Sequence, residues 1–168
     1  TIFGIMKAGA VAVPMFSLFG PDGIRLRVQD CQPEIFFTNA AKAAEALEGG
    51  ARNVTVVDRA FLDALDHLPV TFDWQTAGSD LAVLQYTSGT TRALPAAVQH
   101  THQSIVTLMV AALYATGVRP GDRFFCPSSP AWGHGLWHGT LAPLALGVST
   151  GTFSGKFDPL RLLKGLQD

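Results

Sequence analysis

A hydroxyl-rich loop between two strand-like segments constrains the fold more than any other feature of this chain. The loop is the run Tyr86-Thr-Ser-Gly-Thr-Thr91, preceded by the apolar segment 81–84 and followed by a short strand-like segment, 96–99. Hydroxyls and backbone N–H groups can both donate hydrogen bonds, and glycine lets the backbone approach a ligand closely. The run therefore predicts a cradle for phosphate oxygens at the end of a strand.

Helical and strand-like segments alternate along the rest of the chain. Helices are expected at 1–11, from 21 onwards, and at 40–48, 61–68, 102–116, 131–146 and 159–166. Strands are expected at 34–38, 53–57, 81–86, 96–99, 123–126 and 148–153. This alternation predicts an α/β fold with a mainly parallel sheet flanked by helices. The apolar run 105–118 is shorter than the roughly 20 residues that span a bilayer, so it predicts a buried helix instead.

Composition narrows the classes of partner and compartment. With 168 residues the chain is long enough for one domain with a core. The net charge is −1 without a basic block, which argues against nucleic acid or an anionic membrane as partner. Cys31 and Cys126 lie far apart in apolar settings, so no disulfide framework is expected and a cytoplasmic location fits best.

Two further properties predict a piece of a larger protein. Charged residues make up only 15% of the chain, as expected where part of the surface belongs inside a parent fold. The chain runs from Thr1 to Asp168 without an initial methionine or a terminal signal.

Several segments together resemble the acyl-adenylate-forming enzymes, that is, the acyl-CoA synthetases and their relatives among luciferases and peptide-synthetase adenylation domains. The run Tyr86–Thr91 resembles the signature of that family. Segments similar to the family also occur, in order, at Gly4–Pro14, Leu94–Pro95, Ala97–His102, Gly117–Asp122 and Pro143–Gly147. The resemblance thus spans nearly the whole chain.

The resemblance implies a reaction and a partial domain. In the family a carboxylic acid attacks the α-phosphate of ATP, with Mg²⁺ on the phosphates, and coenzyme A then takes the acyl group. Residues 1–168 would form a single partial domain, a fragment of the large N-terminal domain of the ligase. The ligase would be cytoplasmic, and fatty acid metabolism is one pathway in which such enzymes act. The C-terminal domain with its catalytic lysine and the acidic motif for Mg²⁺ would lie in the remainder of the parent chain, so no catalytic or metal-binding residue is named here.

The resemblance also implies which residues bind ATP. The predicted contacts to its phosphates come from Thr87, Ser88, Gly89, Thr90 and Thr91. Arg92 stands where the family usually has glycine, and Ala96 stands at the position of a lysine. Since a guanidinium suits phosphate, Arg92 is hypothesised to replace the lysine. The alternative is a non-catalytic or degenerate nucleotide-binding relative, and a structural or interaction domain is a third class.

An aromatic segment, Pro130–His138, matches the family's motif near the acyl pocket. Trp132 would contact the acyl group and the adenylate, with His134 close by, because an apolar wall excludes water from the reactive anhydride. Trp137 and His138 are expected to be packing residues. Trp132 points to a short or medium acyl group or an aromatic acid.

Two other patterns have a simpler explanation. Gly147-Val-Ser-Thr-Gly151 fits the serine-hydrolase pattern, but the predicted order is helix then strand, the reverse of what that motif needs. His100-Thr-His102 lacks clustered acidic or cysteine partners for a metal. We predict a helix start there, with Thr101 as N-cap.

Overall fold

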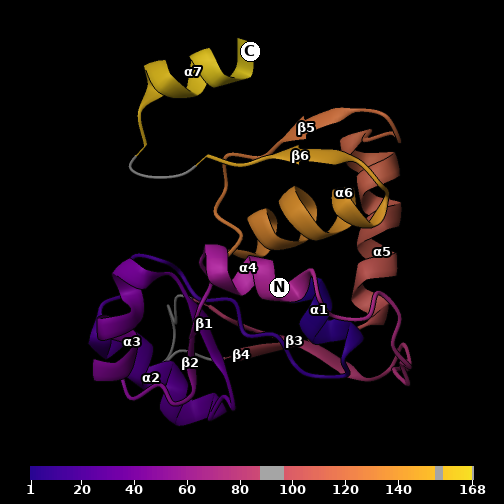
Figure 1. Cartoon of the computed structure of the whole chain (residues 1–168). Helices are drawn as coiled ribbons and strands as arrows, with labels where there is room; N and C mark the ends of the chain where they lie inside the picture. Colours follow the sequence, from indigo (N-terminus) through magenta and orange to yellow (C-terminus); the bar gives the residue numbers. More distant parts are fainter. Residues whose placement is uncertain (88–96, 154–156, 168) are drawn as a thin grey trace. The chain divides into compact units, whose positions relative to one another are not determined.

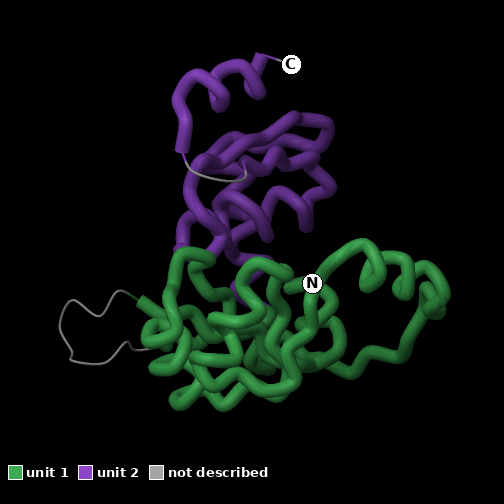
Figure 2. The backbone as a smooth tube through the Cα atoms, turned by 60° about the vertical axis from the view of Figure 1, so that its left-hand side comes forward, with its two compact units in different colours: residues 1–102 green, residues 103–168 purple. Residues whose placement is uncertain are grey.

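The computed structural model describes residues 1–87, 97–153 and 157–167. They form two compact units, Thr1–His102 and Gln103–Asp168 (Figure 2). The single partial domain over 1–168 stays a prediction. The α/β fold class is confirmed, because helices and parallel strand pairs occur in both units.

The first unit contains most of the predicted strands. Its helices are α1 (Ile2–Lys7), α2 (Pro21–Cys31), η1 (Ala40–Lys42), α3 (Ala43–Glu48) and α4 (Arg59–Leu65). Its strands are β1 (Phe36–Thr38), β2 (Val54–Val56), β3 (Leu81–Tyr86) and β4 (Ala97–Thr101). Local chemistry sets the helix starts: Pro21 occupies the first turn of α2, and the Asp58 carboxylate caps α4 by accepting from the Phe61 N–H at 2.9 Å.

The strands β1 and β2 are parallel, with Phe36 opposite Val54. The helical segment η1–α3 connects them, as a parallel pair requires. Figure 1 shows α3 beside both strands, with α2 packed against α3.

The strands β3 and β4 are antiparallel, unlike the mainly parallel sheet that the alternation predicts. The pairing runs from Leu81 opposite Thr101 to Tyr86 opposite Ala97. The reason is the connection 87–96, which is shorter than the dozen or so residues that a parallel crossover needs.

The first helix is shorter than predicted. It ends at Lys7, and Gly9 adopts a left-handed φ of 75°. The chain then becomes extended, because Ala12 donates to the Ala82 carbonyl at 2.8 Å and accepts from the Leu84 N–H at 2.9 Å. Residues 10–13 therefore border β3, and the prediction of a helix over 1–11 is wrong at its C-terminal end.

The second unit repeats the strand–helix–strand arrangement. Its helical segments are α5 (Gln103–Ala111), the π-helical η2 (Ala112–Thr116) and η3 (His134–Leu141), α6 (Ala142–Ala145) and α7 (Pro159–Gln167). The strands β5 (Arg123–Phe125) and β6 (Ser149–Gly151) are parallel, and the run η3–α6 connects them. Since α6 precedes the strand that holds Ser149, the order of elements excludes the serine-hydrolase motif, as predicted.

Two predictions about the start of this unit are wrong. Thr101 is not an N-cap, because it is the last residue of β4, where it pairs with Leu81 of β3. The helix α5 begins only at Gln103. The helical run α5–η2 is not the buried helix predicted, because Val106, Val110 and Tyr114 are exposed, although Ala112 is buried. The apolar run carries no polar face in its sequence that would mark the exposed side. Within the described part of the chain, no helix combines the length and apolar character needed to cross a bilayer.

Candidate functional site

The predicted phosphate loop begins at the end of a buried strand. Tyr86 is the last residue of β3, and Thr87 follows it. Because Tyr86 pairs with Ala97, the connection 87–96 leaves and re-enters the strand pair at the same point. The predicted contacts Ser88, Gly89, Thr90, Thr91 and Arg92 lie outside the described residues, as does Ala96.

The side chain of Tyr86 ties the end of β3 to α2. Tyr86 is only 5% exposed, and its Oη donates to Oδ2 of Asp30 at 2.6 Å. Burial is the main cause that raises the pKa of the Tyr86 phenol well above its ordinary value, and this hydrogen bond raises it further. The phenol therefore stays protonated and remains the donor.

Arg27 completes the surroundings of Tyr86. Its guanidinium carbon lies 3.9 Å from the centre of the Phe19 ring and 5.4 Å from the centre of the Tyr86 ring. Its Nη1 donates to the Gly23 carbonyl at 2.7 Å. Arg27 is 8% exposed, and this burial lowers the pKa of its guanidinium. We call Phe19, Arg27, Asp30 and Tyr86 the Tyr86 cluster; residue spacing gave no signal for it.

Trp132 and His134 lie between β5 and α6. Trp132 is 39% exposed and lies in the turn before η3, where its backbone N–H donates to the Ser129 carbonyl at 3.0 Å. His134 begins η3 and is exposed, and its ring stacks on His138 with 5.3 Å between centroids. Trp137 is 4% exposed, which confirms its predicted packing role. Trp132 thus keeps an accessible surface, as an acyl-pocket residue requires.

Two glycines let η3 approach the segment before it. A Cβ on Gly135 would lie 2.1 Å from the Ser129 carbonyl oxygen, and one on Gly139 would lie 2.8 Å from the Cys126 Sγ. Both distances are too short for a side chain, so only glycine permits this packing. These glycines set the position of η3 and hence of His134. Their spacing of four within a predicted helix was the signal that sequence reasoning missed.

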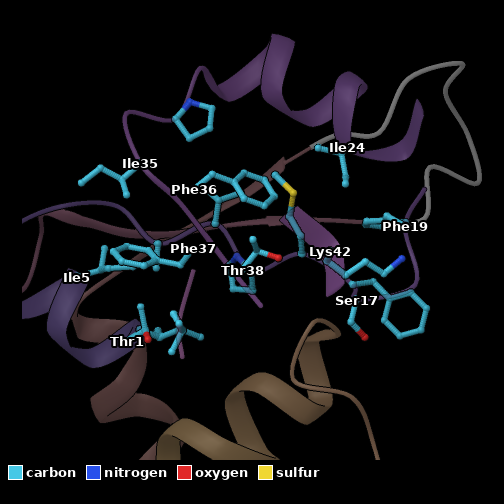
Figure 3. Close-up of a pocket in the computed structure, with 18 of the residues that line it drawn as sticks. Thr1, Ile5, Ser17, Phe19, Ile24, Ile35, Phe36, Phe37, Thr38 and Lys42 are labelled. Carbon is cyan, nitrogen blue, oxygen red and sulfur yellow. The ribbon is translucent and has the colours of Figure 1, made fainter. Parts of the chain in front are cut away.

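The first unit also contains a cavity of about 430 Å³ that the sequence did not predict (Figure 3). Its walls are mostly apolar and come from the segment 11–16 and from β1, with Lys42 on the polar side. Lys42 is already engaged, because its Nζ lies 2.6 Å from Oε2 of Glu45. All of the residues that line it belong to the first unit.

The described residues offer no metal centre. Over 1–87, 97–153 and 157–167, no group of three or more His, Cys, Asp or Glu side chains is placed to hold a metal ion.

Cys31 is a free thiol, and burial raises its pKa, which keeps it in the less reactive protonated form.

A family model and several known proteins match this chain. A family model described as AMP-binding enzyme matches residues 1–168. The 3-hydroxybenzoate–CoA ligase of Aromatoleum sp. (strain CIB) is 30% identical over 173 aligned residues, which cover 96% of this chain and 33% of the ligase. A long-chain-fatty-acid–AMP ligase of Mycobacterium marinum is 34% identical, over 73% of this chain and 20% of that ligase.

Solved structures agree with the sequence matches. The crystal structure of an acyl-CoA synthetase from Brucella canis superposes with a TM-score of 0.88 at 26% identity, over 99% of this chain and 32% of that one. The chain thus spans about a third of the length of this synthetase and of the hydroxybenzoate ligase. The segments that resemble the adenylate-forming signature and the fold that carries them agree with the family model, and the chain belongs to the AMP-binding enzymes.

Proposed function

We propose that this chain carries the ATP phosphate-binding loop and part of the acyl pocket of an AMP-forming acid–thiol ligase. The observation that carries the proposal is the family match over residues 1–168, which includes the loop and the aromatic segment. The names of the relatives support a ligase, since they include a CoA ligase and an AMP ligase.

The loop residues are proposed to hold the β- and γ-phosphates of ATP. The proposed contacts are Thr87, Ser88, Gly89, Thr90, Thr91 and Arg92. Hydroxyls, backbone N–H groups and one guanidinium all donate, and phosphate oxygens all accept. When bound, ATP supplies the α-phosphate that the carboxylate attacks, with pyrophosphate as leaving group, and coenzyme A then displaces AMP from the acyl group. The loop's contribution is to orient the triphosphate.

Trp132 and His134 are proposed to line the acyl pocket. The exposed part of the Trp132 ring supports this role, because a pocket wall needs accessible apolar surface. The turn at Ser129 and the close packing of Gly135 hold this segment in place. The substrate is proposed to be a carboxylic acid, and an apolar wall beside the mixed anhydride would exclude water from it.

ATP–pyrophosphate exchange tests the proposal directly. The full-length gene product is incubated with ATP, Mg²⁺, labelled pyrophosphate and one carboxylic acid at a time, from acetate through hydroxybenzoates to long-chain fatty acids. Exchange that depends on the acid is the expected result. Nucleotide binding without exchange for any acid would contradict the ligase and favour a degenerate nucleotide-binding relative, which Arg92 and Ala96 would then explain.

A further inference from the structure

We propose that Asp30 and Arg27 are positioning residues for the phosphate loop, and that they act through Tyr86. The inference rests on the proposed phosphate-binding function of the residues that follow Tyr86. Neither Asp30 nor Arg27 belongs to the segments that resemble the family signature. Their role follows from the contacts within the Tyr86 cluster.

The hydrogen bond between Tyr86 and Asp30 fixes the base of the loop. It joins residues 56 positions apart in the sequence, at 2.6 Å between Oη and Oδ2. Tyr86, the last residue of β3, also pairs with Ala97, the first residue of β4. The Tyr86 side chain therefore ties the start of the connection 87–96 to helix α2, and strand pairing with Ala97 holds the end of the connection beside it.

Arg27 holds the same ring from another direction. The guanidinium stacks over Phe19 and faces Tyr86, while its hydrogen bond to the Gly23 carbonyl keeps it on α2. Cation–π contacts are stronger when the cation is desolvated, and Arg27 is among the buried charged residues of the chain. Since rotation of the Tyr86 ring would break these contacts, Arg27 limits the positions open to the ring.

Helix stability does not account for an aspartate at position 30. Asp30 is the next-to-last residue of α2, and the last turn of this helix has no basic residue. A carboxylate there faces the negative end of the helix dipole, which is unfavourable. The hydrogen bond to Tyr86 is the contact that makes an acceptor useful at this position.

Small displacements of the loop base would reach the ligand. Thr87, the first proposed phosphate contact, is bonded directly to Tyr86. The Tyr86 cluster would therefore affect phosphate affinity without touching the phosphate itself.

Tripolyphosphate binding to the full-length gene product, measured by isothermal titration calorimetry beside the melting temperature, tests the inference. Tyr86→Phe removes only the hydroxyl, and Asp30→Ala removes the acceptor. Each is expected to weaken binding about tenfold, and the double variant no more than either alone. Asp30→Asn keeps an acceptor oxygen and should recover most of the lost affinity. Arg27→Lys keeps the charge but loses the planar stacking, and should weaken binding about threefold.

Asp58→Ala provides a matched control. It also removes an aspartate that accepts one hydrogen bond, at the N-terminus of α4. It should lower the melting temperature and leave tripolyphosphate binding unchanged. If Asp30→Ala does not fold, Tyr86→Phe decides the question, because it preserves the ring and its packing.

The outcomes separate this inference from the proposed function. Unchanged affinity in Tyr86→Phe and Arg27→Lys, with or without a lower melting temperature, would leave the cluster a purely structural role and overturn the inference. A wild-type chain that does not bind tripolyphosphate would contradict the phosphate loop itself, and the inference with it.

Discussion

Arg92 is the residue at which this chain departs most from the adenylate-forming pattern, together with Ala96 at the lysine position. If Arg92 supplies the missing cation, Arg92→Ala should raise the Kd for ATP about tenfold, because a charge-assisted hydrogen bond to phosphate is lost. The loss should shrink as salt is added. Binding is measured by calorimetry.

The matched control for Arg92 is Arg52→Ala. Arg52 is an exposed arginine far along the chain from the loop, so its removal should leave ATP binding unchanged. Equal ATP affinity in Arg92→Ala and the wild type would show that Arg92 does not replace the charge of the missing lysine.

Substitution of Trp132 should affect substrate binding, whereas substitution of Trp137 should affect the stability of the fold. Trp132→Ala is expected to raise KM for the carboxylic acid about tenfold with KM for ATP unchanged, because it removes apolar contact with the acyl group alone. Trp137→Ala should instead destabilise the fold by about 3–5 kcal/mol, because this ring is buried. The measurements are exchange kinetics of the full-length gene product and urea unfolding of this chain. An unchanged profile of acids in Trp132→Ala would remove it from the pocket.

The Tyr86–Asp30 contact marks the limit of residue-level reasoning. The sequence pattern identified Tyr86 as the first residue of the loop. It did not identify its partner, because a hydrogen bond across 56 positions depends on how α2 packs. The available signal for this partner was a carboxylate at a helix C-terminus. The helix dipole disfavours a negative charge there, so the residue needs another reason to be present.

At the scale of elements, η3 depends on its glycines. Gly135→Ala is expected to destabilise the chain by about 2–4 kcal/mol, because the new Cβ would meet the Ser129 carbonyl and the backbone would have to shift. Gly165→Ala in α7 is the control. Nothing lies within 4 Å of its added Cβ, so the higher helix propensity of alanine should leave stability equal or up to about 1 kcal/mol higher.

Urea unfolding followed by circular dichroism measures both glycine variants. Equal stability of Gly135→Ala and Gly165→Ala would contradict the close approach of η3 to Ser129. Because the segment before η3 carries Trp132, we also expect Gly135→Ala to alter exchange with carboxylic acids more than its affinity for ATP.

Element boundaries were predictable where local chemistry decides them. The predicted strand 81–86 has the same bounds as β3, and α2 begins at Pro21 as expected. The first helix was predicted too long, because the hydrogen bonds of Ala12 with Ala82 and Leu84 favour an extended segment. Those partners lie seventy or so positions away, so no local pattern includes them.

At the scale of the molecule, the two compact units should respond differently to ligand. Tripolyphosphate at ten times its Kd should stabilise the unit that contains the loop base by about 1.4 kcal/mol. In a Trp74→Phe background, tryptophan fluorescence reports only the second unit, which contains Trp132 and Trp137. Its unfolding midpoint in urea should not move, whereas circular dichroism reports both units. A common shift in both signals would mean that the two units unfold as one.

The sequence by itself determined the kind of protein this is. The hydroxyl-rich loop, the alternating helices and strands and the aromatic segment are local patterns, and local patterns identified the family and the α/β fold class. Tertiary structure alone decided the antiparallel pairing of β3 with β4, the exposed face of α5 and the tie from Tyr86 to α2. The physical reason is that strand partners, burial and long-range hydrogen bonds depend on which elements meet in space, and a residue's neighbours in sequence do not specify that.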